Sequence, residues 1–236
     1  MDISKVDLHI HTIACGHGLA TVYEIIEYSN KKDMKIIGIN EHAPSEGTQN
    51  FFFPVLARLP RKFGALEVWR SCEFSFNSEL KLDLREKDLD KLDYFSVSVH
   101  TPPFTSDSKK LTETVIDYIN KYKKLKFICH PCLRGTNYDI EKVTKAACDN
   151  GILMELNNST YSVAGKTDEN CMERTKTMVE ICKENKMPLL INSDAHVLNE
   201  IGNFDAVYNL LSKLKLQKKD IINFDIKRLK QIFEME

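Results

Sequence analysis

The strongest constraint on the fold is an alternation of short apolar runs with longer amphipathic segments. Seven runs have the length and composition of buried strands, namely Val6–Ile10, Ile36–Asn40, Leu66–Cys72, Tyr94–Val99, Lys126–Cys129, Ile152–Leu156 and Leu189–Asn192. Strands that are apolar on both faces and alternate with helices are typical of parallel sheets. We therefore expect a parallel, barrel-like α/β fold. Periodicity does not separate this barrel from an open doubly wound sheet.

The segments between the runs carry apolar stripes at helical spacing. Thr21 and Glu24 form a capping-box signature, which predicts that a helix begins there. Further stripes lie in residues 111–122, 143–147, 171–182 and 204–214, and a short helix is expected at Asp225–Phe233. Two stretches break the alternation. Phe74–Leu84 suggests a hairpin around Asn77 and Ser78, and Ala43–Gly64 reads as a long excursion between a strand and the following helix.

Composition narrows the class of protein. The chain has 236 residues and no linker rich in Pro, Gly or Ser, so we expect residues 1–236 to form one domain. Its 33 Lys and Arg balance 34 Asp and Glu, and a net charge of −1 gives no reason to expect a nucleic-acid partner. No apolar run is long enough for a membrane helix, and the N-terminus lacks the pattern of a signal peptide. We expect a soluble cytoplasmic protein and leave a homo-oligomer open.

The seven cysteines are an odd number scattered along a long chain, which is a poor basis for a disulfide framework. Cys129 and Cys132 have the C-x-x-C spacing of a redox motif or of half a zinc site. No second C-x-x-C occurs, and no redox module surrounds this one. We interpret most of the cysteines as inert buried thiols.

The histidines carry the functional signal. Each of the seven lies at the C-terminal end of a predicted strand or in the loop after it: His9, His11, His17, His42, His100, His130 and His196. Glu73 and Asp194 occupy equivalent places. In a parallel barrel these strand ends share one face, where active sites are built. The sequence therefore predicts one cluster of imidazoles and carboxylates.

Such a cluster suits a metal centre. His9 and His11 are two residues apart on a strand, so both face the same side. Imidazole and carboxylate ligands without thiolate suit zinc, iron or manganese. Nine candidates exceed the needs of one ion and suit two or three, with Glu73 the best candidate to bridge two of them.

Adjacent ions of this kind are typical of phosphoester hydrolysis. Amide or ring hydrolysis at a binuclear, amidohydrolase-like centre is a second interpretation, although no Lys occupies an inward strand-end position that could be carboxylated. A metal store without catalysis is a third.

The successive motifs resemble those of the PHP (polymerase and histidinol phosphatase) family. They are Asp7-Leu-His9-Ile-His11-Thr12, Asn40-Glu41-His42, Glu73, His100, Cys129-His130-Pro131 and Ser193-Asp194-Ala195-His196. Two further motifs, Glu155-Leu-Asn157-Asn158-Ser159-Thr160 and Asp168-Glu-Asn170-Cys171, resemble the YcdX-like phosphatase branch. The resemblance runs from about residue 5 to the C-terminus in the family's motif order.

The resemblance implies a distorted (βα)7 barrel with a trinuclear centre, usually of zinc, with manganese or iron as alternatives. By this resemblance the first ion is held by His9, His11, Glu73 and Asp194, the second by Glu73, His100 and His130, and the third by His17, His42 and His196. We expect Glu73, Asp194 and His196 to take part in catalysis as well. The family usually has Asp where this chain has Glu41, so a contact to one of the ligands is expected to shift. Ala43–Gly64 matches the family poorly.

The function expected from residues and resemblance together is a metal-dependent phosphoesterase acting on small phosphomonoesters by a metal-activated hydroxide. The alternatives are a 3′-5′ nuclease of the same family and a non-catalytic partner domain. Five supporting residues are open to two interpretations each, and of these Asn157 and Asn158 either hydrogen-bond a substrate or a ligand or build a turn. Asp7 either fixes a histidine or begins its strand, and Arg134 and Lys166 either receive phosphate or are solvated charges.

Overall fold

The structure is a parallel sheet rolled into a barrel. The computed structural model describes residues 3–76, 80–81, 86–100 and 107–236. The strands are β1 (Val6–Ile10), β2 (Ile36–His42), β3 (Lys62–Phe63), β4 (Leu66–Ser75), β5 (Phe95–Ser98), β6 (Leu125–Ile128), β7 (Leu153–Asn157) and β8 (Leu190–Asn192). All except β3 pair in parallel in the order β1-β2-β4-β5-β6-β7-β8, while β3 pairs antiparallel with β4. The seven predicted strands and the parallel fold are confirmed, and the two-residue β3 is an addition that the sequence did not predict.

The barrel closes between β1 and β8 by a short and irregular contact. The amide of His11 donates to the carbonyl of Ala195 (2.9 Å), and the amide of Ala195 donates to the carbonyl of His9 (3.3 Å). Next to this bridge a side chain takes the place of backbone pairing between β1 and β8. Asn192 Oδ1 accepts a hydrogen bond from the amide of Leu8 at 2.8 Å. The register of β1 against β2 also shifts between Asp7 and Ile10. The barrel is therefore a distorted (βα)7 barrel and not an open sheet.

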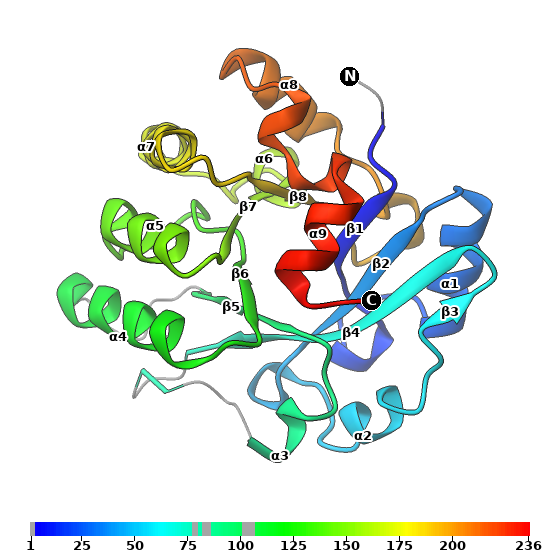
Figure 1. The fold of residues 1–236 in the computed structure, drawn as a ribbon. Coiled ribbons are helices and arrows are strands. Elements are labelled where there is room, and N and C mark those ends of the chain that lie inside the picture. Colours follow the sequence, from blue (N-terminus) through cyan, green and yellow to red (C-terminus); the bar gives the residue numbers. More distant parts are fainter. Residues whose placement is uncertain (1–2, 77–79, 82–85, 101–106) are drawn as a thin grey trace.

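Helices surround the sheet (Figure 1). Their bounds are α1 (Val22–Lys31), α2 (Phe52–Leu56), α3 (Glu86–Leu89), α4 (Ser108–Lys121), α5 (Ile140–Asp149), α6 (Asn158–Ser162), α7 (Cys171–Glu184), α8 (Asp205–Lys213) and α9 (Ile226–Phe233). The predicted stripes fall on α4, α5, α7, α8 and α9, and the Thr21–Glu24 capping box opens α1 as expected. The hairpin expected around Asn77 and Ser78 lies outside the described residues. None of the described helices is long and apolar enough to cross a membrane.

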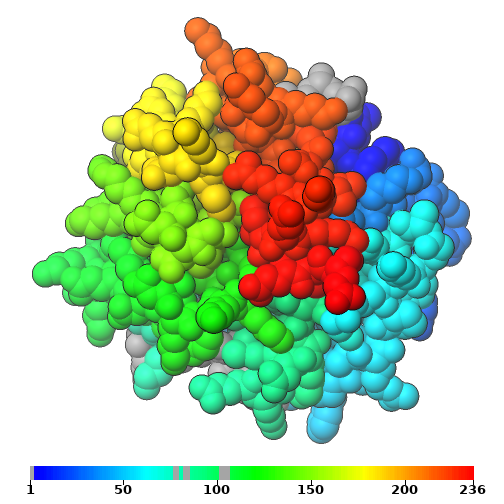
Figure 2. Space-filling model, in the orientation of Figure 1, coloured from blue at the N-terminus to red at the C-terminus, as the bar shows by residue number. Residues whose placement is uncertain are grey.

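One end of the barrel interior is apolar. Trp69 on β4 and Phe127 on β6 are fully buried there, and Tyr94 packs against both beside Phe233 of α9. Figures 1 and 2 show α9 lying across this end of the barrel. Gly38 on β2 leaves room for this layer, since a Cβ there would lie 2.0 Å from Tyr94 Oη. The N-terminal ends of the strands are thus closed by packed side chains.

The interior becomes polar toward the C-terminal ends of the strands. Asn40 on β2 accepts hydrogen bonds from Ser71 Oγ (2.7 Å) and Ser96 Oγ (3.1 Å), which links three neighbouring strands. On the other side of the barrel Asn192 Nδ2 donates to Glu155 Oε1 at 2.8 Å. Buried polar groups are stable only when they are hydrogen-bonded, and here they bond to one another. This polar layer lies next to the histidines at the strand ends.

Candidate metal centre

The structure brings all nine predicted side chains together at the C-terminal end of the barrel. β1 carries His9, and the loop after it carries His11 and His17. The remaining six are His42 on β2, Glu73 on β4, and His100, His130, Asp194 and His196 after β5, β6 and β8. His9, His11 and Glu73 are at most 1% exposed, whereas His17 is exposed at the rim. The rule that parallel strand ends share a face explains the gathering.

The carboxylate of Glu73 is the centre of the inner part of the cluster. Five ring nitrogens surround it: His9 Nε2 (3.3 Å), His11 Nε2 (3.5 Å) and His42 Nδ1 (3.2 Å) from Oε2, and His130 Nε2 (2.8 Å) and His100 Nε2 (3.4 Å) from Oε1. Each oxygen thus faces its own set of histidines. This is the arrangement expected of a carboxylate that bridges two cations.

Asp194, in the loop after β8, faces two of the histidines that surround Glu73. Its Oδ1 lies 3.2 Å from His11 Nε2 and 3.6 Å from His9 Nε2. The backbone of Asp194 has φ = 58°, and that of His130 has φ = 28°. Both values lie in the left-handed region, which costs a residue other than glycine about 1–3 kcal/mol. Strain of this kind persists where the surroundings hold it, and here the amide of His130 is held by Glu155 at 2.6 Å.

His17, His42 and His196 form a group nearer the solvent, called here the outer histidines. The ring of His17 lies 4.8 Å from that of His196 and 5.0 Å from that of His42, between centroids. His11 joins this group to the inner one, since its ring stacks on His42 (4.1 Å) and on His196 (4.4 Å). Ligand atoms of His11, His42 and His196 all lie within 4.8 Å of one another.

Three histidines that face Glu73 through Nε2 each have a second glutamate at Nδ1, the other ring nitrogen. Glu155 Oε1 lies 2.9 Å from His9 Nδ1, Glu41 Oε1 lies 3.4 Å from His11 Nδ1, and Glu46 Oε1 lies 2.6 Å from His100 Nδ1. A carboxylate on one ring nitrogen orients the other toward a metal and raises its basicity. Glu41 also accepts the amide of Thr12 at 2.9 Å, so the residue that replaces the family's Asp supports the first loop.

Two of these glutamates received no role from the sequence. Glu155 begins the Glu155–Thr160 motif at the end of β7, which could have marked it as a strand-end carboxylate. Glu46 lies in the 43–64 segment that matches the family poorly, and no local pattern pointed to it. Its Oε2 lies 3.1 Å from His42 Nδ1, so one side chain spans the inner and outer groups.

The carboxylates and histidines of the cluster stabilise one another's charged forms. Burial would raise the pKa of Glu73, but His9, His100 and His130 outweigh it and hold that pKa well below its usual range. Burial would lower the pKa of His11, yet Asp194 and Glu41 raise it to about 9. In the same way Glu73 and Glu46 raise the pKa of His100 to about 10 against its burial. The carboxylates are therefore ionised at neutral pH and attract cations.

The donor set fits divalent metal ions. His11 Nε2 and His42 Nδ1 are buried and have no hydrogen-bond partner in the described part of the chain, although both face carboxylate oxygens. Buried polar atoms without partners are rare in proteins and call for an explanation. A cation between nitrogen and oxygen atoms would satisfy both kinds of atom at once. Imidazole and carboxylate donors suit zinc and also accept manganese or iron.

A pocket of about 490 Å³ opens onto the cluster. Its lining residues are His17, His42, Glu46, His100, His130, Leu133, Lys166, Asp194 and His196. Lys166 donates to Ser159 Oγ (2.7 Å) and lies 3.7 Å from Asp194 Oδ2, so it belongs to the site, whereas Arg134 is exposed and does not line the pocket.

Asp7 supports the loop after β8. Its carboxylate accepts from Ser193 Oγ (2.6 Å) and from the amides of Ser193 (3.1 Å) and Gly202 (2.9 Å). It therefore fixes the loop that carries Asp194.

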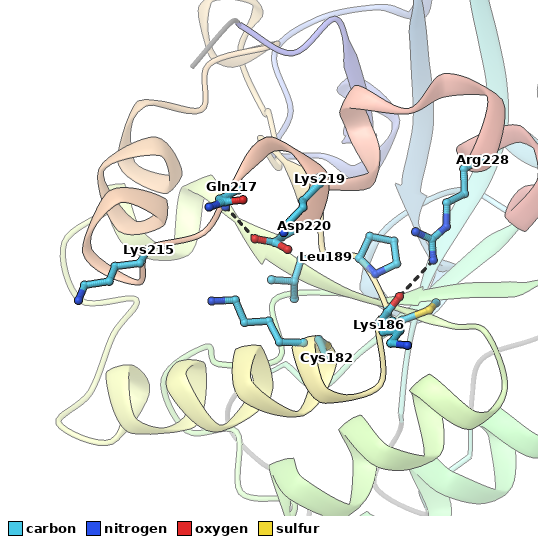
Figure 3. A pocket seen from close by; sticks show the side chains of 11 residues that line it. Cys182, Lys186, Leu189, Lys215, Gln217, Lys219, Asp220 and Arg228 are labelled. Atoms are coloured by element: carbon cyan, nitrogen blue, oxygen red, sulfur yellow. Dashed lines mark hydrogen bonds between the residues drawn. The ribbon is translucent and has the colours of Figure 1, made fainter.

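Cys132 of the C-x-x-C pair and a second pocket are separate from this chemistry, whereas Cys129 Sγ lies within 4.8 Å of donor atoms of His9 and Glu73. Cys129 and Cys132 are free and 1% exposed, and burial raises the pKa of Cys132 to about 12, so this thiol stays protonated. A further pocket of about 470 Å³ lies beside Leu189 at the start of β8, at the opposite end of the barrel (Figure 3). Lys186, Lys215 and Arg228 line it, and none of the nine predicted residues does.

The chain is similar to known proteins over most of its length. Residues 7–159 match the PHP domain family. A probable phosphatase of Clostridium novyi is 30% identical over 228 residues, covering 95% of this chain and 92% of the relative. One of Clostridium acetobutylicum is 30% identical over 230 residues, covering 95% and 92%.

Two solved structures share the fold at 12% sequence identity and a TM-score of 0.62. One is the histidinol phosphate phosphatase of Lactococcus lactis in complex with zinc, L-histidinol and phosphate, with 92% of this chain and 95% of that chain covered. The other is a chain of archaeal ribonuclease P with mature tRNA, with 97% and 90% covered. The matched domain spans well over half of the sequence, and the chain belongs to the PHP family.

Proposed function

We propose that residues 1–236 act as one metal-dependent phosphoesterase domain that hydrolyses small phosphomonoesters at a centre of three divalent ions. The observation that carries the proposal is the position of Glu73, whose two carboxylate oxygens face five histidine nitrogens at 2.8–3.5 Å. The names of the relatives, which are probable phosphatases, support a phosphatase.

The ligand set of the proposed centre is the nine residues predicted from the sequence. His9, His11, Glu73 and Asp194 would hold one ion, Glu73, His100 and His130 a second, and His17, His42 and His196 a third. Zinc is the proposed metal because imidazole is the commonest donor here and the Lactococcus lactis phosphatase was solved with zinc. When bound, such ions activate water at neutral pH and neutralise charge on phosphoryl oxygens.

The chain's own residues bind and orient the substrate. Lys166 presents an ammonium group to the pocket and is steadied by Ser159, so it is suited to receive a phosphate oxygen. Asp194 and His196 line the same pocket and lie beside the bound phosphate in this proposal. Glu46 and Glu155 keep the histidine rings from turning, so the site is built before substrate arrives.

The pocket favours a small substrate over a nucleic-acid strand. A strand needs a basic groove with aromatic side chains on which bases stack. Among the described lining residues Lys166 is the one lysine or arginine, and none is Phe, Tyr or Trp. The chain of archaeal ribonuclease P is similar to this protein in fold alone, and that similarity gives no reason to propose a non-catalytic role.

The test is a panel of phosphomonoesters, phosphodiesters and short single strands, assayed with protein reconstituted with zinc or manganese. Monoester hydrolysis should dominate, and Glu73→Gln should reduce it by about 10²-fold or more while losing metal. Glu27→Gln makes the same charge change on the exposed face of α1 and should behave as wild type. Full metal content and turnover in Glu73→Gln would refute the bridging role, and efficient strand cleavage with little monoester hydrolysis would refute the substrate class.

A further inference from the structure

Cys15 lies among the outer histidines, although its sequence context marked it only as one of several buried thiols. It ends the 3₁₀ turn η1 (Ile13–Cys15) in the loop between β1 and α1, and it is 3% exposed. Its Sγ and ring nitrogens of His17 and His196 all lie within 4.8 Å of one another. Thiolate and imidazole are the donors that zinc prefers.

The loop backbone keeps this cysteine in place. Gly18 packs directly on Thr12, since a Cβ at Gly18 would lie 2.3 Å from the Thr12 carbonyl oxygen. The amide of Gly18 donates to Cys15 Sγ (3.3 Å), and the amide of Leu19 donates to the carbonyl of His196 (2.9 Å). The loop that carries Cys15 is thereby tied to the loop that carries His196.

The neighbouring histidines independently point to a bound cation. His11 Nε2 and His42 Nδ1 are buried atoms without hydrogen-bond partners in the described residues, and the ring of His11 stacks on those of His42 and His196 in the outer group. Sγ of Cys15 also lies within 4.8 Å of donor atoms of His11 and Glu41. The thiol therefore lies among potential metal ligands on two sides, with His17 and His196 in one group and His11 and Glu41 in another, and it is not an isolated cysteine.

We propose that Cys15 is a tenth ligand of the metal centre and completes the outer position with His17 and His196. This inference rests on the metal centre of the proposed function. On binding, the thiol releases its proton to solvent and the thiolate coordinates the ion. A thiolate is a soft donor, so the outer position prefers zinc, whereas the inner positions, built from nitrogen and oxygen, also accept manganese or iron.

Two rival roles for the buried thiols make different predictions. As a purely structural residue, Cys15 needs only the hydrogen bond that its thiol donates to the Thr12 carbonyl at 3.1 Å. Cys129 is a rival thiolate, because its Sγ lies within 4.8 Å of donor atoms of His9 and Glu73 below the inner group. Cys132 is equally buried, but its thiol interacts with Thr175 of α7, so it serves as the matched control.

The experiment loads the full chain with cobalt(II) and records its absorption spectrum together with its metal content. A thiolate ligand gives a sulfur-to-cobalt charge-transfer band in the near ultraviolet. We expect this band in the wild type, Cys129→Ser and Cys132→Ser proteins, and we expect it to be absent in Cys15→Ser. In competition between zinc and excess manganese, Cys15→Ser should lose zinc affinity by about 10-fold or more at one position.

The possible outcomes test the role of Cys15 separately from the existence of the metal centre. Cobalt bound by wild type without the band would overturn the role of Cys15 and leave the metal centre standing, and so would a band lost in Cys129→Ser instead. No cobalt uptake by the wild type would overturn both proposals. The wild-type spectrum by itself decides whether any thiolate binds the ion, and the spectra of Cys15→Ser and Cys129→Ser decide which cysteine supplies it. A melting curve checks that each variant is folded.

Discussion

Replacing Glu155 by Gln should damage the metal centre and the fold together. The carboxylate of Glu155 is fully buried and accepts from four donors. On Oε1 these are His9 Nδ1 (2.9 Å) and Asn192 Nδ2 (2.8 Å), and on Oε2 they are the amide of His130 (2.6 Å) and Asn157 Nδ2 (3.1 Å). Burial would raise the pKa of Glu155, but His9 and these hydrogen bonds lower it, so it is ionised at neutral pH.

The amide of Gln can satisfy only one side of this arrangement. With its oxygen toward His9, its NH₂ group meets the donors of His130 and Asn157. With its NH₂ toward His9, a hydrogen bond forms only if Nδ1 accepts, and the proton then sits on Nε2, the nitrogen that faces Glu73 and Asp194. Two buried N–H groups lose their acceptor, at about 1–3 kcal/mol each. The expected loss is roughly 2–6 kcal/mol, a large share of a total stability of about 5–15 kcal/mol.

Two measurements check this prediction. Thermal unfolding with a chelator isolates the fold, and elemental analysis after reconstitution isolates the metal. Glu155→Gln should unfold well below the wild type and bind metal about 10- to 100-fold more weakly. Glu27→Gln is the control, because its one ion pair is exposed. Metal content and melting temperature both equal to those of the wild type would refute the reasoning.

Four further predictions concern metal, salt and pH. Elemental analysis of protein purified without chelator should approach about three transition ions per chain, and a value near zero after reconstitution would contradict the centre. Metal binding should release protons, because the raised pKa values of His11 and His100 keep these rings protonated in the metal-free protein. The affinity for metal should therefore increase as pH rises toward about 9. Calorimetry in buffers of different ionisation enthalpy measures the proton release. The kcat/KM for a monoester should fall only about a few-fold between about 50 and about 200 mM salt, and a steep salt dependence would favour nucleic-acid binding. Finally, the metal-free protein should lose stability as pH falls from 6.5 toward about 4. Burial and the neighbouring His11 lower the pKa of His196 from 6.5 to about 4 in the folded protein. Between these pH values the unfolded chain therefore binds more protons than the folded protein, and acid favours unfolding. Urea unfolding of chelator-treated protein across this range measures the slope, and a flat profile would contradict it.

The sequence determined the parallel strands and the gathering of the nine side chains, whereas the closure of the sheet into a barrel was seen only in the structure. Period and length identify buried strands, and parallel strands place their C-terminal ends on one face whatever the loops do. His9 and Glu73 could therefore be assigned to one site from the sequence. The capping box at Thr21 was equally local, since its two hydrogen bonds join residues three apart.

Only the tertiary structure decided which groups support those side chains. Glu46 reaches His100 from 54 residues away because the beginning of the 43–64 segment lies at the pocket that opens onto the cluster. Cys15 meets His196 because Gly18 packs on Thr12, and Asn192 closes the barrel with its side chain instead of its backbone. Each of these contacts depends on the path of a loop or an irregular strand edge. Such paths are set by packing between distant segments, which leaves no periodic trace in the sequence.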